Sequence, residues 1–251
     1  MTTSLDVVIP VLNEEEALPT SVSRLRQFLA SDFVNYDRRI VIADNGSTDS
    51  TPEVGEALSE QYSDVEYMRL EQRGRGRALR MAWMESDADI VSYMDVDLST
   101  DLKAFPVLVR AIEREGFDLA IGSRLKRGAR VFQRPFKREL ISRAYSLVFR
   151  AMFLTRFSDA QCGFKALSRR AAHEVVPLVQ DTGWFFDTEL LILAEKNGYR
   201  INEVPVVWTD DPDSRVRILS TAYEDVKGLL RLKLGGLREA SKALSARGRG
   251  Q

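Results

Sequence analysis

Short apolar runs alternate with segments of helical periodicity through the first hundred residues. The apolar runs predict buried strands at 5–10, 39–43, 65–70 and 90–94. Apolar residues spaced three or four positions apart predict helices between them, over 14–29, 52–61 and 77–85. Strands that alternate with helices form a mostly parallel, doubly wound sheet. We therefore predict an α/β fold in which helices flank one sheet.

The same alternation continues along the rest of the chain. It predicts strands at 119–122 and 204–208 and helices at 137–157 and 186–197. A further helix over 215–234 is amphipathic, since apolar residues recur at helical spacing with basic residues between them. No internal repeat or long linker divides the sequence. We predict one domain over 1–235, ending in this helix, and a flexible tail over 236–251.

Composition narrows the classes of function. The chain has 36 basic and 37 acidic residues and a net charge of -1, which does not favour nucleic-acid binding. One cysteine, Cys162, and one histidine, His173, exclude an internal disulfide and argue against a His-rich zinc site or a Ser-His-Asp triad. The sequence shows no signal-peptide pattern and no apolar run of roughly 20 residues. We expect a cytoplasmic protein that meets a membrane only at its surface.

Two acidic residues, Asp95 and Asp97, follow the predicted strand at 90–94. Alternate carboxylates at a strand end can approach one divalent ion, and hard oxygen ligands favour Mg²⁺ or Mn²⁺. Such ions bind through one or two carboxylates together with substrate phosphates. Acidic residues also end strands without binding a metal, so the pair by itself leaves both interpretations open.

Two other loops carry polar chemistry. The turn at 44–49 contains Asn-Gly followed by Ser, Thr and Asp, which is typical of a turn that leads into a helix. Asp44 differs because it stands at a strand end, where its carboxylate can accept hydrogen bonds from a base or a ribose. The run 73–77 alternates arginine with glycine. It is either a solvated basic loop or a flexible loop that lets the backbone and the Arg75 guanidinium approach phosphates.

Several motifs, in this order and spacing, resemble those of family 2 glycosyltransferases of GT-A fold. They lie at 8–15, 44–49, 74–76, 95–97 and 122–124. Within that family, the segments at 159–165, 184–189 and 203–208 look like those of the polyprenyl-phosphate (dolichyl-phosphate) sugar synthases. The Gln-Cys-Gly-Phe-Lys form at 161–165 leans toward the glucosyl branch rather than the mannosyl one. The resemblance covers roughly 5–216.

The resemblance implies roles for the matching residues. The nucleoside pocket would be lined by Pro10, Leu12, Glu14 and Asp44. Asp95 and Asp97 would serve the metal and the diphosphate, while Arg124 and Arg215 would meet phosphates. Two positions depart from the family pattern, because Asn45 replaces a usual Asp and Ser99 stands where mannosyl relatives often have Gln. The second departure leaves open whether a third side chain binds the metal directly.

The resemblance also implies an inverting transfer of a hexose from a nucleotide-diphosphate sugar. The metal and the arginines would stabilise charge on the departing nucleotide diphosphate. A polyprenyl monophosphate acceptor is already anionic and needs no strong general base. A hydroxyl acceptor would instead need a carboxylate such as Asp159, Asp187 or Glu189 to take its proton. Asp187 and Glu189 can equally well orient a neighbouring helix.

Two predicted helices combine apolar residues with basic ones. The helix at 137–157 contains Arg143 and Arg150, and the helix at 215–234 has the same character. Both fit docking on an anionic membrane surface, on the cytoplasmic face, and both fit an ordinary core helix. Two rival functions remain: a family 2 glycosyltransferase with a water-soluble hydroxyl acceptor, and a non-catalytic nucleotide-sugar binding protein. The nucleotide base, the sugar and the oligomeric state stay open.

Overall fold

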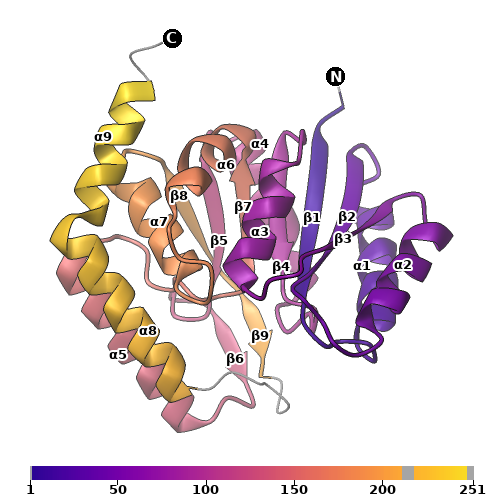
Figure 1. Cartoon of the computed structure of the whole chain (residues 1–251), viewed down its shortest axis with the longest axis horizontal. Helices are drawn as coiled ribbons and strands as arrows, with labels where there is room; N and C mark the ends of the chain where they lie inside the picture. Colours follow the sequence, from indigo (N-terminus) through magenta and orange to yellow (C-terminus); the bar gives the residue numbers. More distant parts are fainter. Residues whose placement is uncertain (1, 211–217, 248–251) are drawn as a thin grey trace.

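The computed structural model describes residues 2–210 and 218–247, and its centre is a seven-stranded sheet with helices on both faces (Figure 1). In spatial order the strands are β3 (Val65–Arg69), β2 (Asp37–Asp44), β1 (Ser4–Val11), β4 (Ile90–Met94), β7 (Phe164–Ser168), β5 (Leu119–Ser123) and β8 (Ile201–Pro205). Neighbouring strands are parallel except at β7, which runs antiparallel to both β4 and β5. The predicted mostly parallel α/β sheet is confirmed.

Each face of the sheet has its own hydrophobic core. One core includes residues of α1 (Leu18–Asp32), α2 (Thr51–Gln61) and α4 (Phe105–Glu113). The other includes residues of α3 (Arg75–Met84), α6 (Arg169–Val175) and α7 (Phe186–Lys196). Successive side chains of a strand point to opposite faces, so Val8 of β1 joins one core while Val7 and Ile9 join the other.

The strand predicted at 204–208 is in fact two strands in two sheets. β8 ends at Pro205, and β9 (Val207–Thr209) pairs with β6 (Arg130–Phe132) in a separate two-stranded sheet. The change of sheet falls at Val206, whose N–H donates to the Ser123 carbonyl while its own carbonyl accepts from the Arg130 N–H. This crossing carries the chain from the main sheet toward the loop after β5.

Two helices lie next to each other at one edge of the domain, α5 (Phe136–Phe153) and α8 (Ile218–Arg231) (Figure 1). They are joined where Lys233, just after α8, donates to the Met152 carbonyl near the end of α5 at 2.7 Å. The helix predicted over 137–157 stops at Phe153 because Leu154 takes a left-handed conformation with φ of 53°.

The flexible tail expected over 236–251 is replaced by α9 (Leu237–Arg247) as far as residue 247. This helix forms because Ala240 is buried, and Leu237 and Leu244 pack against the core that α7 also serves. Residues 248–251 lie outside the described part of the chain.

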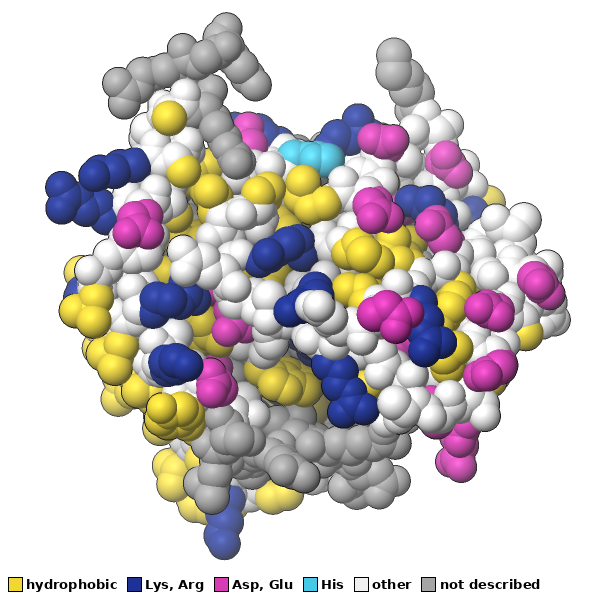
Figure 2. Space-filling model, in the orientation of Figure 1, with side chains coloured by type: hydrophobic (Ala, Val, Ile, Leu, Met, Phe, Trp, Pro, Cys, Tyr) yellow, Lys and Arg dark blue, Asp and Glu magenta, His cyan; other side chains and the backbone are white. Residues whose placement is uncertain are grey.

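Large apolar side chains are exposed on α5 and α8. We call this set the α5/α8 apolar face, and it comprises Phe136, Leu140, Ile141, Leu147 and Val148 on α5 and Tyr223, Val226 and Leu230 on α8. Figure 2 shows hydrophobic side chains gathered along the lower left edge, where these helices lie in Figure 1. Within residues 2–210 and 218–247, no helix is long and apolar enough to cross a membrane.

Candidate active site

The loops that follow β1 and β2 meet at the carboxyl ends of these strands, where ligands of open α/β sheets bind. The Asn13 N–H donates to Ser47 Oγ at 2.9 Å, and the Glu14 N–H donates to Thr51 Oγ1 at 2.8 Å. These bonds tie the first loop to the turn, and they explain why α1 begins at Leu18 rather than at 14. Of the four residues expected to line the nucleoside pocket, Leu12 and Glu14 are partly exposed on this loop and Pro10 is partly exposed near the end of β1.

Asp44 fixes the turn at 44–49 through hydrogen bonds to its buried carboxylate. Its carboxylate is fully buried, with Oδ1 accepting from the Ser47 N–H at 2.9 Å and Oδ2 accepting from the Tyr67 hydroxyl at 2.7 Å. Burial and the neighbouring Asp44 carboxylate raise the pKa of Tyr67 well above its usual range. Asn45, the departure from the family pattern, accepts a hydrogen bond from the Gly74 N–H. The turn is therefore connected to the Gly-Arg loop that precedes α3.

Arg75, at the start of α3, is a fixed positive charge beside Asp95. Its Nη2 is 2.8 Å from Asp95 Oδ1, and its Nη1 is 2.7 Å from Asp187 Oδ2. The guanidinium also lies 4.8 Å from the centroid of the Tyr93 ring and 5.1 Å from that of Trp184. Burial alone would lower the pKa of Arg75, but these neighbouring groups hold it well above its usual value. Arg75 therefore stays charged next to the strand end that bears Asp95.

Asp187 is the centre of a buried ionic cluster behind this strand end. It is 3% exposed, both of its oxygens lie 2.8 Å from the Tyr93 hydroxyl, and its Oδ1 lies 3.2 Å from Lys165 Nζ. Burial would raise the pKa of Asp187, but Lys165 and Arg75 lower it below its usual value. Asp187 is thus held as a carboxylate that orients Arg75, and it accepts protons poorly.

Glu189 lies on α7 with Asp187 but serves a different contact. It is 1% exposed and pairs with Arg231 of α8, with Oε1 and Oε2 at 2.8 and 2.7 Å from the two Nη atoms. Its partner is a helix at the edge of the domain rather than the strand end at Asp95. Of the two roles considered for Asp187 and Glu189, these contacts favour the orientation of neighbouring elements over proton transfer.

Asp97 stands two residues beyond Asp95 and is exposed. Its Oδ1 accepts from the Ser99 N–H at 2.9 Å. Both carboxylates line a small hollow together with Ser99 and Gly163. A Cβ added to Gly163 would lie 1.7 Å from Asp95 Oδ2, so the absence of a side chain at 163 makes room for this carboxylate.

The hollow fits a divalent ion that shares its ligands with a substrate. Two carboxylates supply hard oxygens, and Mg²⁺ or Mn²⁺ typically completes such a site with substrate phosphates. Among the residues that the structure describes, no group of three or more His, Cys, Asp or Glu could hold a metal. Asp95 and Asp97 could supply two of the ligands, and substrate phosphate and water could supply the others.

Arg124, after β5, forms a two-pronged ion pair with Asp159. Its Nε lies 2.8 Å from Asp159 Oδ2 and its Nη2 lies 2.9 Å from Oδ1, while its backbone N–H also donates to Oδ2. Both side chains are almost entirely buried. Burial would raise the pKa of Asp159, but Arg124 lowers it to about 2. Asp159 therefore remains ionised and fixes the direction of the Arg124 guanidinium.

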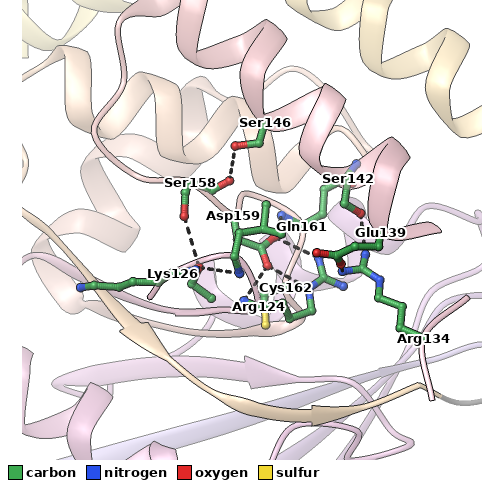
Figure 3. Close-up of polar contacts among 12 residues, drawn as sticks. Arg124, Lys126, Arg134, Glu139, Ser142, Ser146, Ser158, Asp159, Gln161 and Cys162 are labelled. Atoms are coloured by element: carbon green, nitrogen blue, oxygen red, sulfur yellow. Dashed lines mark hydrogen bonds and ion pairs between the residues drawn. The ribbon is translucent and has the colours of Figure 1, made fainter. Parts of the chain in front are cut away.

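A second arginine, Arg134, lies in the same cluster. Arg124 and Arg134 both lie beside the Trp208 ring, 5.4 and 5.5 Å from its centroid. Arg134 donates to Glu139 at 2.9 Å and to Ser142, and Figure 3 shows it reaching from its loop toward these two side chains on α5, beside the Arg124–Asp159 pair. Burial, and then the nearby Arg124, lower the pKa of Arg134. Two arginines therefore meet at one aromatic ring.

The structure brings together most of the predicted site residues. Asp95, Asp97, Arg75 and Asp187 lie around one strand end, whereas Glu189 points toward α8. Arg215 lies outside the described residues. Sequence reasoning missed Arg134, because no motif surrounds it, and missed the role of Glu203, whose Oε1 accepts from the backbone N–H groups of both Ser158 and Asp159. The sequence did contain a signal for Glu203, because this acidic residue is the first of the motif at 203–208.

Solved structures define the class of this fold. Glucosyl-3-phosphoglycerate synthase from Mycobacterium tuberculosis in complex with UDP matches 92% of this chain and 80% of its own, with a TM-score of 0.69 and 23% identity. Its complex with Mn²⁺, UDP and phosphoglyceric acid matches 93% and 79%, with a TM-score of 0.70 and 21% identity. The fold is that of GT-A glycosyltransferases.

The family follows from the sequence itself. The protein-family model described as "Glycosyl transferase family 2" matches residues 6–176 of this chain. This chain belongs to glycosyltransferase family 2, and the expected resemblance is confirmed.

The curated relatives differ in length. Glycosyltransferase AglD of Haloferax volcanii is 35% identical over 86% of this chain, which spans about a third (34%) of that protein. Dolichyl-phosphate beta-glucosyltransferase of Dictyostelium discoideum is 28% identical over 91% of this chain and 73% of its own. The enzyme of that name from Saccharomyces cerevisiae is 27% identical over 93% and 75%.

Proposed function

We propose that this protein is an inverting, metal-dependent glycosyltransferase that moves a hexose from a nucleotide-diphosphate sugar to a polyprenyl (dolichyl-type) monophosphate. The main support for the proposal is that the candidate general bases are held in their ionised form by ion pairs. Asp159 pairs with Arg124 and has a pKa of about 2, and Asp187 pairs with Arg75 and Lys165 and has a lowered pKa. Such carboxylates accept protons poorly. An acceptor that is already anionic suits this site better than a hydroxyl does.

The donor would bind at the carboxyl ends of β1, β2 and β4. Its nucleoside would lie against Pro10, Leu12 and Glu14, beside the turn that Asp44 holds. Asp95 and Asp97 would hold Mg²⁺ or Mn²⁺ with the diphosphate, and the ion would offset the charge that builds on the leaving group. Solved relatives of this fold hold Mn²⁺ or Mg²⁺ together with UDP.

Arg75 would add a fixed charge next to the diphosphate. It is already oriented by Asp187 and by the Tyr93 and Trp184 rings, so little reorganisation would be needed as negative charge develops. Arg215 remains a candidate for the same role on the evidence of the family motif.

The acceptor phosphate would meet Arg124 and Arg134. The Arg134 side chain is only 7% exposed. Its Nε is buried and has no hydrogen-bond partner within residues 2–210 and 218–247. A buried N–H without a partner is costly, and a phosphate oxygen would supply one. Trp208 keeps the two guanidinium groups together by lying beside both.

The lipid chain of such an acceptor would be met at the α5/α8 apolar face. Arg143 and Arg150 on α5 are exposed among the apolar residues, as expected for a helix in the interface of an anionic membrane. We propose that the protein docks there from the cytoplasmic side. The names of the relatives, dolichyl-phosphate beta-glucosyltransferases, support a glucosyl donor.

Transfer from a set of radiolabelled nucleotide sugars to polyprenyl phosphate tests the proposal, with Mg²⁺ or Mn²⁺ present and free nucleotide monitored in parallel. We expect label to enter the lipid fraction with one donor. Label in a water-soluble hydroxyl acceptor alone would support the soluble-acceptor alternative. Donor binding without any transfer would support the non-catalytic one.

A further inference from the structure

Helix α8 has two unlike faces. Its outer side chains belong to the α5/α8 apolar face, with Tyr223 68% and Val226 51% exposed. Its inner face contains Asp225 and Leu229, which are 4% and 1% exposed, and Leu232, directly after the helix, continues this spacing and is 1% exposed. Asp225 thus places an acidic side chain at a buried position, in line with the apolar Leu229 and Leu232.

The inner face is packed closely against the domain. A Cβ added to Gly228 would lie 2.3 Å from Cδ1 of Phe185, so the helix backbone nearly touches the Phe185 ring. One turn later, Arg231 holds the buried Glu189. Asp225 is therefore fixed in place and has little freedom to turn toward water.

Asp225 contacts the loop of Gln161 and Asp159, which lies next to Arg124, a residue proposed to meet the acceptor phosphate. Gln161 Nε2 donates to Asp225 Oδ2 at 2.8 Å. The backbone N–H of Gln161 donates to Asp159 Oδ1 at 3.1 Å, the same oxygen that receives Arg124 Nη2. A continuous path of hydrogen bonds thus runs from α8 through Gln161 and Asp159 to Arg124, and Figure 3 shows the last three side by side.

We propose that Asp225 is a positioning residue that ties helix α8 to the loop of Gln161 and Asp159, and so holds Arg124 in place for the acceptor phosphate. The role of Arg124 in this statement rests on the proposed function, whereas the contact itself does not. Nothing in the chemistry of sugar transfer requires an acidic group at 225, and the residue belongs to none of the motifs that resemble the family.

The surroundings of Asp225 favour its neutral form. Among the residues that the structure describes, the groups that face it are Gln161 from the loop, Tyr145 from α5 and Asp181 from the segment before α7, and none of these three is a cation. Its Oδ1 is buried without a hydrogen-bond partner among the described residues. Burial raises the pKa of Asp225 to about 7. Asp225 is therefore an uncharged acid at mildly acidic pH. Its Oδ2 accepts from Gln161 in either form, but ionisation leaves an unpaired charge at a buried position, so we expect ionisation to loosen the packing of α8 against the loop of Gln161 and Asp159.

Three variants test this role, with Glu224→Gln as the matched control on the exposed side of the same helix. Asp225→Ala removes the acceptor for Gln161, so kcat/KM for polyprenyl phosphate should fall at least tenfold while KM for the donor stays within about twofold. Gln161→Ala should do the same. The double variant should be no worse than either single one, because both break one path. The proposal would be overturned if kcat/KM fell equally for donor and acceptor, or if the two single substitutions had additive effects in the double variant.

Asp225→Asn separates positioning from a merely structural role. The amide keeps an oxygen for Gln161 and cannot ionise, so its kcat/KM should lie within about threefold of wild type at pH 6. The ratio of variant to wild-type kcat/KM should then rise as the pH passes about 7. A ratio that stays constant from pH 6 to 8.5 would show that ionisation of Asp225 does not affect the use of the acceptor, and would contradict this role.

A second readout keeps the contact testable if wild-type protein transfers nothing to polyprenyl phosphate, which would sink the proposed function. The folded state holds the Asp225 proton up to about pH 7, whereas the unfolded chain releases it at about pH 3.9. The unfolding free energy of wild type relative to Asp225→Asn should therefore fall as pH rises across that window and level off above it. No difference between the two pH profiles would mean that Asp225 is not held as a buried neutral acid.

Discussion

Gly163→Ala is the smallest change that should disable the proposed metal site. The added Cβ would lie 1.7 Å from Oδ2, 2.2 Å from Cγ and 2.5 Å from Oδ1 of Asp95. A carbon atom and an oxygen atom that do not share a bond lie about 3.3 Å apart or more. The carboxylate must therefore move by roughly 1.6 Å, the difference between that spacing and the 1.7 Å to Oδ2.

The fold should accommodate that movement. Gly163 does not lie in the left-handed region that favours glycine, so alanine there carries no strain of that kind. The Asp95 side chain is 42% exposed and can swing toward water. We expect the unfolding free energy to change by no more than about 1 kcal/mol, the scale of a partly exposed ion pair.

Activity should respond far more strongly. A misplacement of about 1 Å at a catalytic group can cost on the order of 100-fold, which corresponds to about 2.7 kcal/mol of transition-state stabilisation. The assays are kcat/KM for sugar transfer and Mn²⁺ affinity in the presence of nucleoside diphosphate, and both should weaken together. Gly183→Ala is the control, because its nearest atom would be Asp181 Oδ1 at an ordinary 3.6 Å. Wild-type affinity and turnover in Gly163→Ala would refute the placement of the metal at Asp95.

Three further predictions concern the candidate site and the α5/α8 apolar face. Excess chelator, or Asp97→Asn, should abolish most turnover and leave the fold intact, since Asp97 is exposed; a fully active Asp97→Asn would remove this residue from the metal site. Arg124→Ala should cost on the order of 2 kcal/mol of transition-state stabilisation, and an unchanged kcat/KM would refute its role. Liposomes that contain anionic lipid should bind the protein, less so at high salt and after joint Arg143→Glu and Arg150→Glu substitution, because each basic residue near such a surface contributes about 1 kcal/mol. Binding that ignores salt and both substitutions would exclude this mode of docking.

The sequence predicts those parts of the fold whose pattern is local. The apolar run at 90–94 predicts β4 with the bounds that the structure has. The acids directly after it make up the candidate metal site. β7 was not predicted, because Lys165 interrupts its apolar pattern. Lys165 can be buried because it pairs with Asp187, which is distant in sequence, and donates to the Tyr93 hydroxyl and the Cys162 carbonyl. That partnership exists only after folding.

Site residues that belong to local motifs could be inferred from the sequence, whereas those that depend on distant neighbours could not. Asp95 and Arg124 belong to motifs, so their place could be inferred from order and spacing. Arg134 and Asp225 stand in segments without a motif, and their chemistry arises from burial and from neighbours on other elements. A raised or lowered pKa cannot be seen in a residue letter, and neither can an N–H that lacks a partner.

The most direct test of the central claim is the identity of the acceptor. Purified protein is incubated with a labelled nucleotide-diphosphate hexose, Mn²⁺ and polyprenyl monophosphate, and the label is followed into the lipid fraction, with Asp97→Asn as the inactive control. We expect a metal-dependent glycolipid in which the sugar is joined to the phosphate with inverted anomeric configuration. Label that reaches a soluble hydroxyl acceptor, and never the lipid phosphate, would contradict it.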